Sequence, residues 1–156
     1  MHNLLTTLFV LSIASTTLAG GLEPFPGVKY SRIKAFYFND EGGRPECDMP
    51  LNEDGSLCSS VQGPGKVLSK KQVKKLLTTL NDPASYQRLF AKCFVPHHAL
   101  VAYNAKGKPV AQVSICFKCD RLYTEPSKPN SRSLSGQGQA ALQNLCRDLG
   151  LKACDK

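Results

Sequence analysis

Two apolar runs decide the fold of this chain: Ala99-Leu-Val-Ala-Tyr103 and Val110-Ala-Gln-Val-Ser-Ile-Cys-Phe117. Both have the length and composition of strands, and the segment between them, Asn104-Ala-Lys-Gly-Lys108, contains the glycine typical of a hairpin loop. In the second run apolar residues alternate with Gln, Ser and Cys116, so we expect an apolar face on one side and Cys116 on the other. The two runs therefore predict a central β-hairpin.

Further elements are expected on both sides of this hairpin. Val28–Phe38 is rich in aromatic and β-branched residues and predicts a strand. Ser69 is a suitable N-cap for a helix whose apolar residues recur at i, i+3, i+4 and i+7 and which stops at Asn81-Asp82-Pro83. A last helix starts near Ser135 and ends at Gly150, a typical C-cap residue.

Two stretches carry no regular pattern. Residues 42–66 are dense in Gly, Pro, Asn and Asp and contain Cys47 and Cys58, so they need a staple or a function to be ordered. Residues 124–133 are rich in Pro, Ser and Asn and predict an exposed, mobile loop. The order of the elements predicts an α+β fold, with a small, mostly antiparallel sheet, a central β-hairpin, two packed helices and reinforcing disulfides.

Residues 1–19 have the features of a secretory signal peptide. The apolar stretch Leu4–Leu18 is too short for a comfortable membrane span, and small residues precede a cut after Ala19. We therefore expect residues 20–156 to form a single α+β domain without a membrane span, located in the periplasm or secreted. Export also places the seven cysteines in an oxidising compartment, where pairing is the default.

The chain is basic, with a formal net charge of +8, which favours anionic partners. Its Lys and Arg residues are scattered, and no basic run interleaves with aromatic residues as in a nucleic-acid-binding surface. We therefore expect no nucleic-acid partner, and a basic surface that mainly keeps a monomer soluble. The expected partner is an unidentified envelope component or another protein.

Four cysteines form two economical local pairs. Cys47 and Cys58 flank a Gly/Asp-rich loop, and closing such a loop contributes roughly 3 kcal/mol in the chain-entropy model. Cys146, on the last helix, and Cys154, beyond its Gly cap, would fasten the C-terminal tail to that helix. One sequence does not fix the connectivity.

The other three cysteines, Cys93, Cys116 and Cys119, stand near two histidines, and three interpretations compete. In the first, Cys93 bridges to Cys116 or Cys119. In the second, Cys93, His97, Cys116 and Cys119 bind zinc or copper through three thiolates and one imidazole. In the third, Cys116 and Cys119 exchange thiols and disulfides, although no helix follows to activate them. His97 and His98 should point to opposite sides, since they are adjacent on a strand.

No catalytic or cofactor-binding residue is assigned. The sequence lacks paired carboxylates, a phosphate-binding glycine loop and a nucleophile elbow, and nothing ties an orienting carboxylate to the histidines. The favoured function is therefore binding without catalysis, with metal binding as the alternative and thiol redox activity third.

The order of several short motifs resembles that of a group of small, uncharacterised exported bacterial proteins. These motifs are Leu-Ser-Lys-Lys-Gln (68–72), Leu-Asn-Asp-Pro-x-Ser-Tyr (80–86), Cys-Phe-x-Pro-His-His (93–98), Ser-Ile-Cys-Phe-x-Cys (114–119) and Leu-Ser-x-x-Gly (134–138). The resemblance covers most of residues 28–151. It implies a single exported bacterial domain and transfers no catalytic residue, because the group has no known activity.

Overall fold

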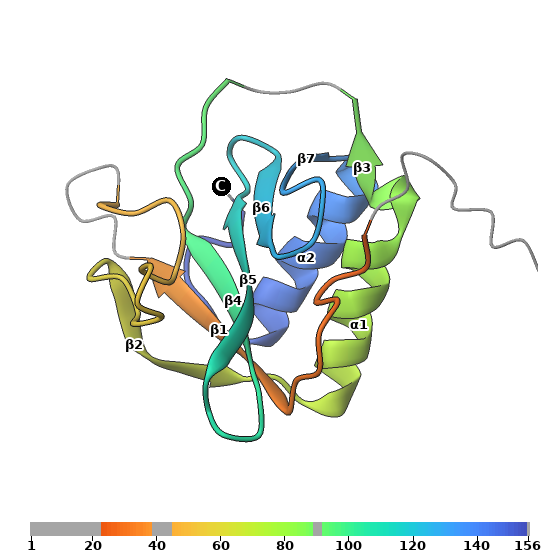
Figure 1. The fold of residues 1–156 in the computed structure, drawn as a ribbon. Helices are drawn as coiled ribbons and strands as arrows, with labels where there is room; N and C mark the ends of the chain where they lie inside the picture. The colour runs from red at the N-terminus through yellow and green to blue at the C-terminus, as the bar shows by residue number, and fades with distance from the viewer. Residues whose placement is uncertain (1–22, 39–44, 89–91, 156) are drawn as a thin grey trace, which may run out of the picture.

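The structure, a computed structural model, describes residues 23–38, 45–88 and 92–155. Over these residues the chain forms one seven-stranded antiparallel sheet, and two α-helices pack on one of its faces (Figure 1). The predicted α+β class is therefore confirmed. In chain order, the elements are β1 (Arg32–Phe38), β2 (Val61–Val67), α1 (Lys70–Asn81), the 3-10 helix η1 (Pro83–Ser85), β3 (Tyr86–Gln87), β4 (His98–Tyr103), β5 (Pro109–Cys116), β6 (Arg121–Glu125), β7 (Ser131–Leu134) and α2 (Gly136–Asp148).

The predicted hairpin forms the centre of the sheet. The strand order is β2-β1-β4-β5-β6-β7-β3, so β4 and β5 are paired with each other and flanked on both sides. Their register places Leu100 opposite Val113 and His98 opposite Ile115. Because Leu100, Val113 and Ile115 are buried, this register is fixed by the apolar face that packs on the helices.

Both helices start where the sequence predicts. The Ser69 hydroxyl accepts a hydrogen bond from the Gln72 backbone N–H, and the Gln72 side chain accepts one from the Ser69 N–H, which together form a capping box. The Ser135 hydroxyl accepts a hydrogen bond from the Gly138 N–H at the start of α2. Each cap satisfies backbone donors that the first helical turn leaves without a partner.

The main core lies between the helices and the sheet. Leu76 and Leu80 of α1 and Leu142 and Leu145 of α2 pack in one cluster with the helix-facing residues of the strands. The alternation of side chains along β4 sends Ala99 and Val101 to the opposite face. There they form a second cluster with Phe36 and Phe38 of β1, against which Leu51 and Val61 pack.

The prediction of irregular structure is wrong for parts of both stretches. Residues 61–66 belong to β2, whose Gly-Pro-Gly segment has positive φ at Gly63 and Gly65 and hides the strand in the sequence. The predicted loop 124–133 contains the end of β6 and most of β7. Both strands carry polar residues. Pairing with β5 aligns β6, with Leu122 opposite Ile115, and β6 in turn aligns β7, with Arg132 opposite Leu122.

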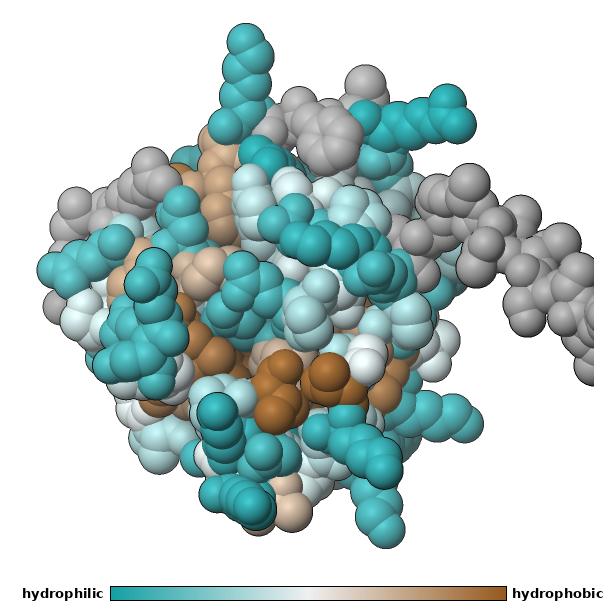
Figure 2. Space-filling view, viewed as in Figure 1, coloured by the Kyte–Doolittle hydropathy of each residue, from teal (hydrophilic) through white to brown (hydrophobic). Residues whose placement is uncertain are grey.

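The export prediction rests on residues 1–19, which lie outside the described residues. Among the residues that are described, no helix is long and apolar enough to cross a membrane. Hydrophilic side chains cover most of the face seen in Figure 2.

Candidate functional site

The structure joins Cys93 to Cys119, one of the two bridges that the sequence allows for Cys93. Their Cα atoms lie 5.8 Å apart, a normal separation for a disulfide. Metals bind cysteine as the thiolate, and a bridged sulfur offers none. With this bridge closed, the predicted zinc or copper site has lost two of its four ligands, and only Cys116 and His97 remain.

Cys116 is the one free cysteine in the part of the chain that the structure describes, and it is fully buried. Val113 and Ile115 belong to the helix-facing core, so Cys116 lies on the other face of β5. The His97 N–H donates to the Ile115 carbonyl at 3.1 Å, and Ile115 is also the partner of His98, so the pairing is irregular where β4 begins. Of the four predicted ligands, Cys93 and Cys119 are therefore bound to each other, and Cys116 is buried on β5.

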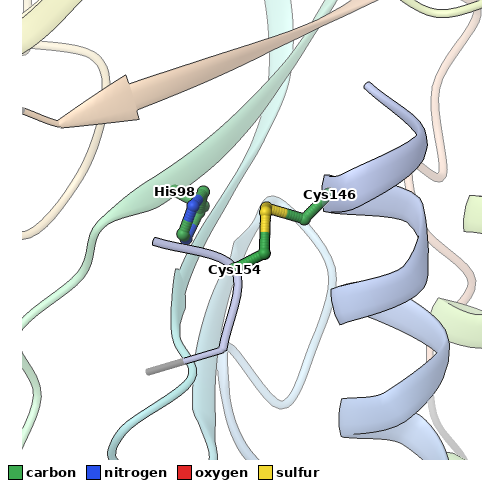
Figure 3. Close-up of side chains that lie close together, drawn as sticks. All are labelled: His98, Cys146 and Cys154. Atoms are coloured by element: carbon green, nitrogen blue, oxygen red, sulfur yellow. A yellow bond between two sulfur atoms is a disulfide. The ribbon is translucent and has the colours of Figure 1, made fainter. Parts of the chain in front are cut away.

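His98 instead faces the C-terminal bridge between Cys146 and Cys154 (Figure 3). Its side chain is 3 % exposed, and its Nε2 lies 2.7 Å from the Lys152 carbonyl oxygen. Because a carbonyl oxygen only accepts, Nε2 must carry the hydrogen of this bond. A ring nitrogen of His98 and the two sulfur atoms lie within 4.8 Å of one another.

Several contacts fasten the C-terminal tail beside this histidine. The bridge ties the end of α2 to Cys154, and the Leu151 N–H donates to the Cys146 carbonyl. From β2, the Lys66 ammonium donates to the Leu149 carbonyl at 2.7 Å and to the Gly150 carbonyl at 3.1 Å. The cation thereby satisfies carbonyl groups at the end of the helix.

A second candidate site is a cavity of about 530 Å³ on the face of the sheet away from the helices. One wall is the loop that the Cys47–Cys58 bridge closes, and the rest comes from the β4–β5 turn, β5 and β6. The lining residues are Met49, Leu51, Asn52, Glu53, Asp54, Gly55, Lys108, Pro109, Gln112 and Glu125.

A buried amide connects the loop to the floor of this cavity. The Gln112 side chain is only 8 % exposed, and its oxygen accepts a 3.1 Å hydrogen bond from the Leu51 N–H. Its amide nitrogen donates to a carboxylate oxygen of Glu125 at 2.6 Å. One side chain from β5 therefore holds both the loop and the carboxylate of Glu125 in place.

The loop is also ordered by its own hydrogen bonds. The Asn52 N–H donates to the Ser56 carbonyl, and the Gly55 N–H donates to the Asn52 carbonyl. A carboxylate oxygen of Asp54 accepts from the N–H and the hydroxyl of Ser56, at 2.8 and 2.6 Å. These bonds stabilise the charged carboxylate and lower the pKa of Asp54 below its usual value.

The charge of the cavity is opposite to that of the chain. Glu53, Asp54 and Glu125 line it with three carboxylates, against the single ammonium of Lys108. The chain as a whole carries +8. The cavity is therefore an acidic site on a basic protein, open to solvent through its exposed carboxylates.

The sequence predicted neither the position of His98 beside the C-terminal bridge nor the acidic cavity. The composition of residues 42–66 indicated a loop that needs a staple or a function, but it did not indicate that Gln112 and Glu125 lie beneath it. His98 shares the phase of Leu100 along β4, and Cys146 lies on the apolar stripe of α2. Those two patterns are the signal that could have placed the histidine near the C-terminal pair.

Comparisons of this chain with protein-family models, with curated proteins and with solved structures found no match. Function is therefore inferred from the residues of the chain itself.

Proposed function

We propose that the protein is an exported domain that binds its ligand without catalysis, in the cavity bounded by the loop of the Cys47–Cys58 bridge. The observation that carries this proposal is the cavity of about 530 Å³ whose wall is closed by a disulfide. Its size lies within the range of roughly 300–1,000 Å³ that is common for ligand sites. A bridge across a binding loop lowers the entropy that the loop would lose on binding.

The ligand should present a basic group. Carboxylates Glu53, Asp54 and Glu125 outnumber Lys108 at the cavity, and the Gln112 amide already holds Glu125 in position. A primary amine or a guanidinium would form charge-assisted hydrogen bonds with these oxygens. The low pKa of Asp54 keeps this carboxylate charged at every pH above the usual range of an aspartate.

The partner is an envelope component or another protein that carries such a group on its surface. Three disulfides support a protein that works outside the cytoplasm, in the periplasm or secreted. A cavity of this size accommodates one or two side chains of a larger partner, or one small molecule.

Capture from a cell-envelope extract tests the proposal. Residues 20–156 are immobilised as wild type, as Glu125→Lys and as Asp148→Lys, which makes the same charge change on the exposed end of α2. We expect Glu125→Lys to reduce the captured partner at least ten-fold and Asp148→Lys to leave it unchanged. Addition of NaCl should weaken capture by the wild type, since the contact is between charges.

Two results would contradict the proposal: failure of the wild-type domain to retain any partner, or equal retention by both variants. Circular dichroism and thermal unfolding of the three proteins establish beforehand that each is folded.

A further inference from the structure

The buried group of His98, Cys146 and Cys154 has a chemistry that the binding site does not use. All three side chains are less than 5 % exposed, and their candidate ligand atoms lie within 4.8 Å of one another (Figure 3). We propose that a dithiol reductant opens the Cys146–Cys154 bridge, and that the two thiolates and His98 then bind one zinc ion. The closed bridge is the state that cannot bind the metal.

The geometry requires only a short movement of the sulfur atoms. Zinc binds sulfur at about 2.3 Å and nitrogen at about 2.0–2.1 Å, so tetrahedral ligand atoms lie roughly 3.4–3.8 Å apart. The bridged sulfurs must separate by about 2 Å to reach this spacing. The Cα atoms of Cys146 and Cys154 lie 5.7 Å apart, so rotation of the two side chains about their Cα–Cβ bonds would supply the movement while the tail stays in place.

The structure also contains space beside these ligands. A cavity of about 20 Å³ lies between the sheet and α2, and both His98 and Cys146 line it. This volume has room for about one water molecule, but nine of the eleven lining residues are apolar, so a water would enter only with the ion as its polar partner. A water there would complete the four-coordinate shell that zinc prefers, with three ligands from the protein.

If the hydrogen bond from Nε2 of His98 to Lys152 persists, zinc must bind the ring through Nδ1. Since Nε2 donates to the Lys152 carbonyl, the lone pair of the neutral ring is on Nδ1. Histidines that bind metals commonly donate their other N–H to a carbonyl in this way, which orients the ring and raises its basicity.

Burial favours a divalent ion over a monovalent one. Two thiolates in a buried site carry two negative charges, and a zinc ion neutralises both. A copper(I) ion would leave one uncompensated negative charge, which is costly away from water. The site is therefore assigned to zinc.

The exchange balances in electrons and protons. The dithiol transfers two electrons and two protons to the bridge and becomes a disulfide, which leaves thiols at Cys146 and Cys154. Zinc binding then releases the two thiol protons to solvent. In the reverse exchange a disulfide accepts two electrons from the two thiolates and two protons from solvent and becomes a dithiol, which re-forms the bridge and releases the ion. Zinc occupancy would then follow the ratio of dithiol to disulfide around the protein.

Residue-resolved thiol protection on the wild-type domain tests this inference. Residues 20–156 are reduced with a phosphine, which does not compete for zinc as a dithiol would, and are alkylated with and without one equivalent of ZnCl₂. Mass spectrometry of the peptides gives the rate at each cysteine. Zinc should slow the alkylation of Cys146 and Cys154 at least ten-fold and leave Cys47 and Cys58 unchanged. Equal rates with and without zinc, or equal protection of all cysteines, would overturn the inference.

A matched pair of variants assigns the nitrogen ligand. Zinc affinity of the reduced protein should fall at least ten-fold in His98→Gln, whose amide can still donate to Lys152, and should be unchanged in His97→Gln. An unchanged affinity in His98→Gln would exclude the histidine as a ligand. If this variant does not fold, the wild-type protection experiment still decides whether the two cysteines bind zinc.

Discussion

Replacing Gly138 by alanine should destabilise the protein by about 3 kcal/mol, because the new methyl group would meet backbone that cannot move. A Cβ on Gly138 would lie 2.9 Å from the carbonyl carbon and the Cα of Ser85, and closer still to its oxygen. The Ser135 N–H donates to the same Ser85 oxygen at 2.9 Å, and the Ser135 hydroxyl donates to the Ala84 carbonyl at 2.7 Å. These bonds fasten η1 to the start of α2, so relief would require α2 to shift on the sheet.

Gly136→Ala is the control for this effect. It lies two residues earlier in α2, and a Cβ there would meet no atom within 4 Å. Alanine should be neutral or slightly stabilising at this position, by up to about 0.5–1 kcal/mol, because it costs less conformational entropy than glycine in a helix. Urea unfolding measures both variants. Equal changes in the two would show that contact with Ser85 does not limit the residue at position 138.

The second large effect is expected for Arg132→Met, which should cost about 3 kcal/mol or more. The Arg132 side chain is only 3 % exposed and donates to Pro129, Lys128, Glu23 and Leu80 carbonyl oxygens at 2.9–3.4 Å. Methionine fills similar space but removes the arginine donor from all four carbonyl oxygens, of which Leu80 keeps the Tyr86 hydroxyl and Lys128 keeps the Glu23 N–H. Buried polar groups that lose their hydrogen bonds retain the full cost of their desolvation.

The guanidinium of Arg132 also donates to the Tyr86 hydroxyl at 3.3 Å and stacks over the tyrosine ring. Burial raises the pKa of Tyr86, so the phenol stays neutral and donates in turn to the Leu80 carbonyl. One arginine thereby joins the N-terminal segment, α1, β3 and the loop before β7. Its loss should therefore destabilise the whole domain rather than one strand.

Arg121→Met provides the comparison for Arg132→Met. Arg121 is half-buried, stacks on Phe94 and Tyr123, and donates to the Tyr123 and Ser131 hydroxyls. Because water can reach this site, its replacement should cost only about 1 kcal/mol. Equilibrium unfolding in urea ranks the two variants, and a larger loss at position 121 would contradict the role given to Arg132.

Local signals account for the parts of the fold that the sequence predicted. The alternation in residues 110–117, the cap at Ser69 and the helix start near Ser135 each depend on a few neighbouring residues. β2 and β7 were missed because their polar residues and glycines carry no periodic pattern. The neighbouring strands β1 and β6 align them, and such pairing over long sequence separations leaves little trace in either strand.

The two candidate sites show the same division between local signals and contacts over long sequence separations. The local pairs Cys47–Cys58 and Cys146–Cys154 follow from loop length, and Cys93 uses one of its two allowed partners. The hydrogen bond between Gln112 and Leu51 joins residues 61 positions apart in the sequence, and the one between His98 and Lys152 joins residues 54 positions apart. Neither contact is encoded in spacing. The phase of His98 along β4 and the apolar stripe of α2 could have placed the histidine near the C-terminal cysteines, but no local pattern indicates that Gln112 lies beneath the loop.

Site-specific photo-crosslinking tests the central claim, that the acidic cavity binds the partner, most directly. A photoreactive residue replaces Glu53 on the cavity wall in one protein and Gln137 on the exposed side of α2 in another, and each is irradiated in envelope extract. We expect a discrete crosslinked partner from position 53 that is absent from position 137 and is lost when Glu125→Lys is added. Crosslinks of equal intensity from both positions, or none from position 53, would contradict the account.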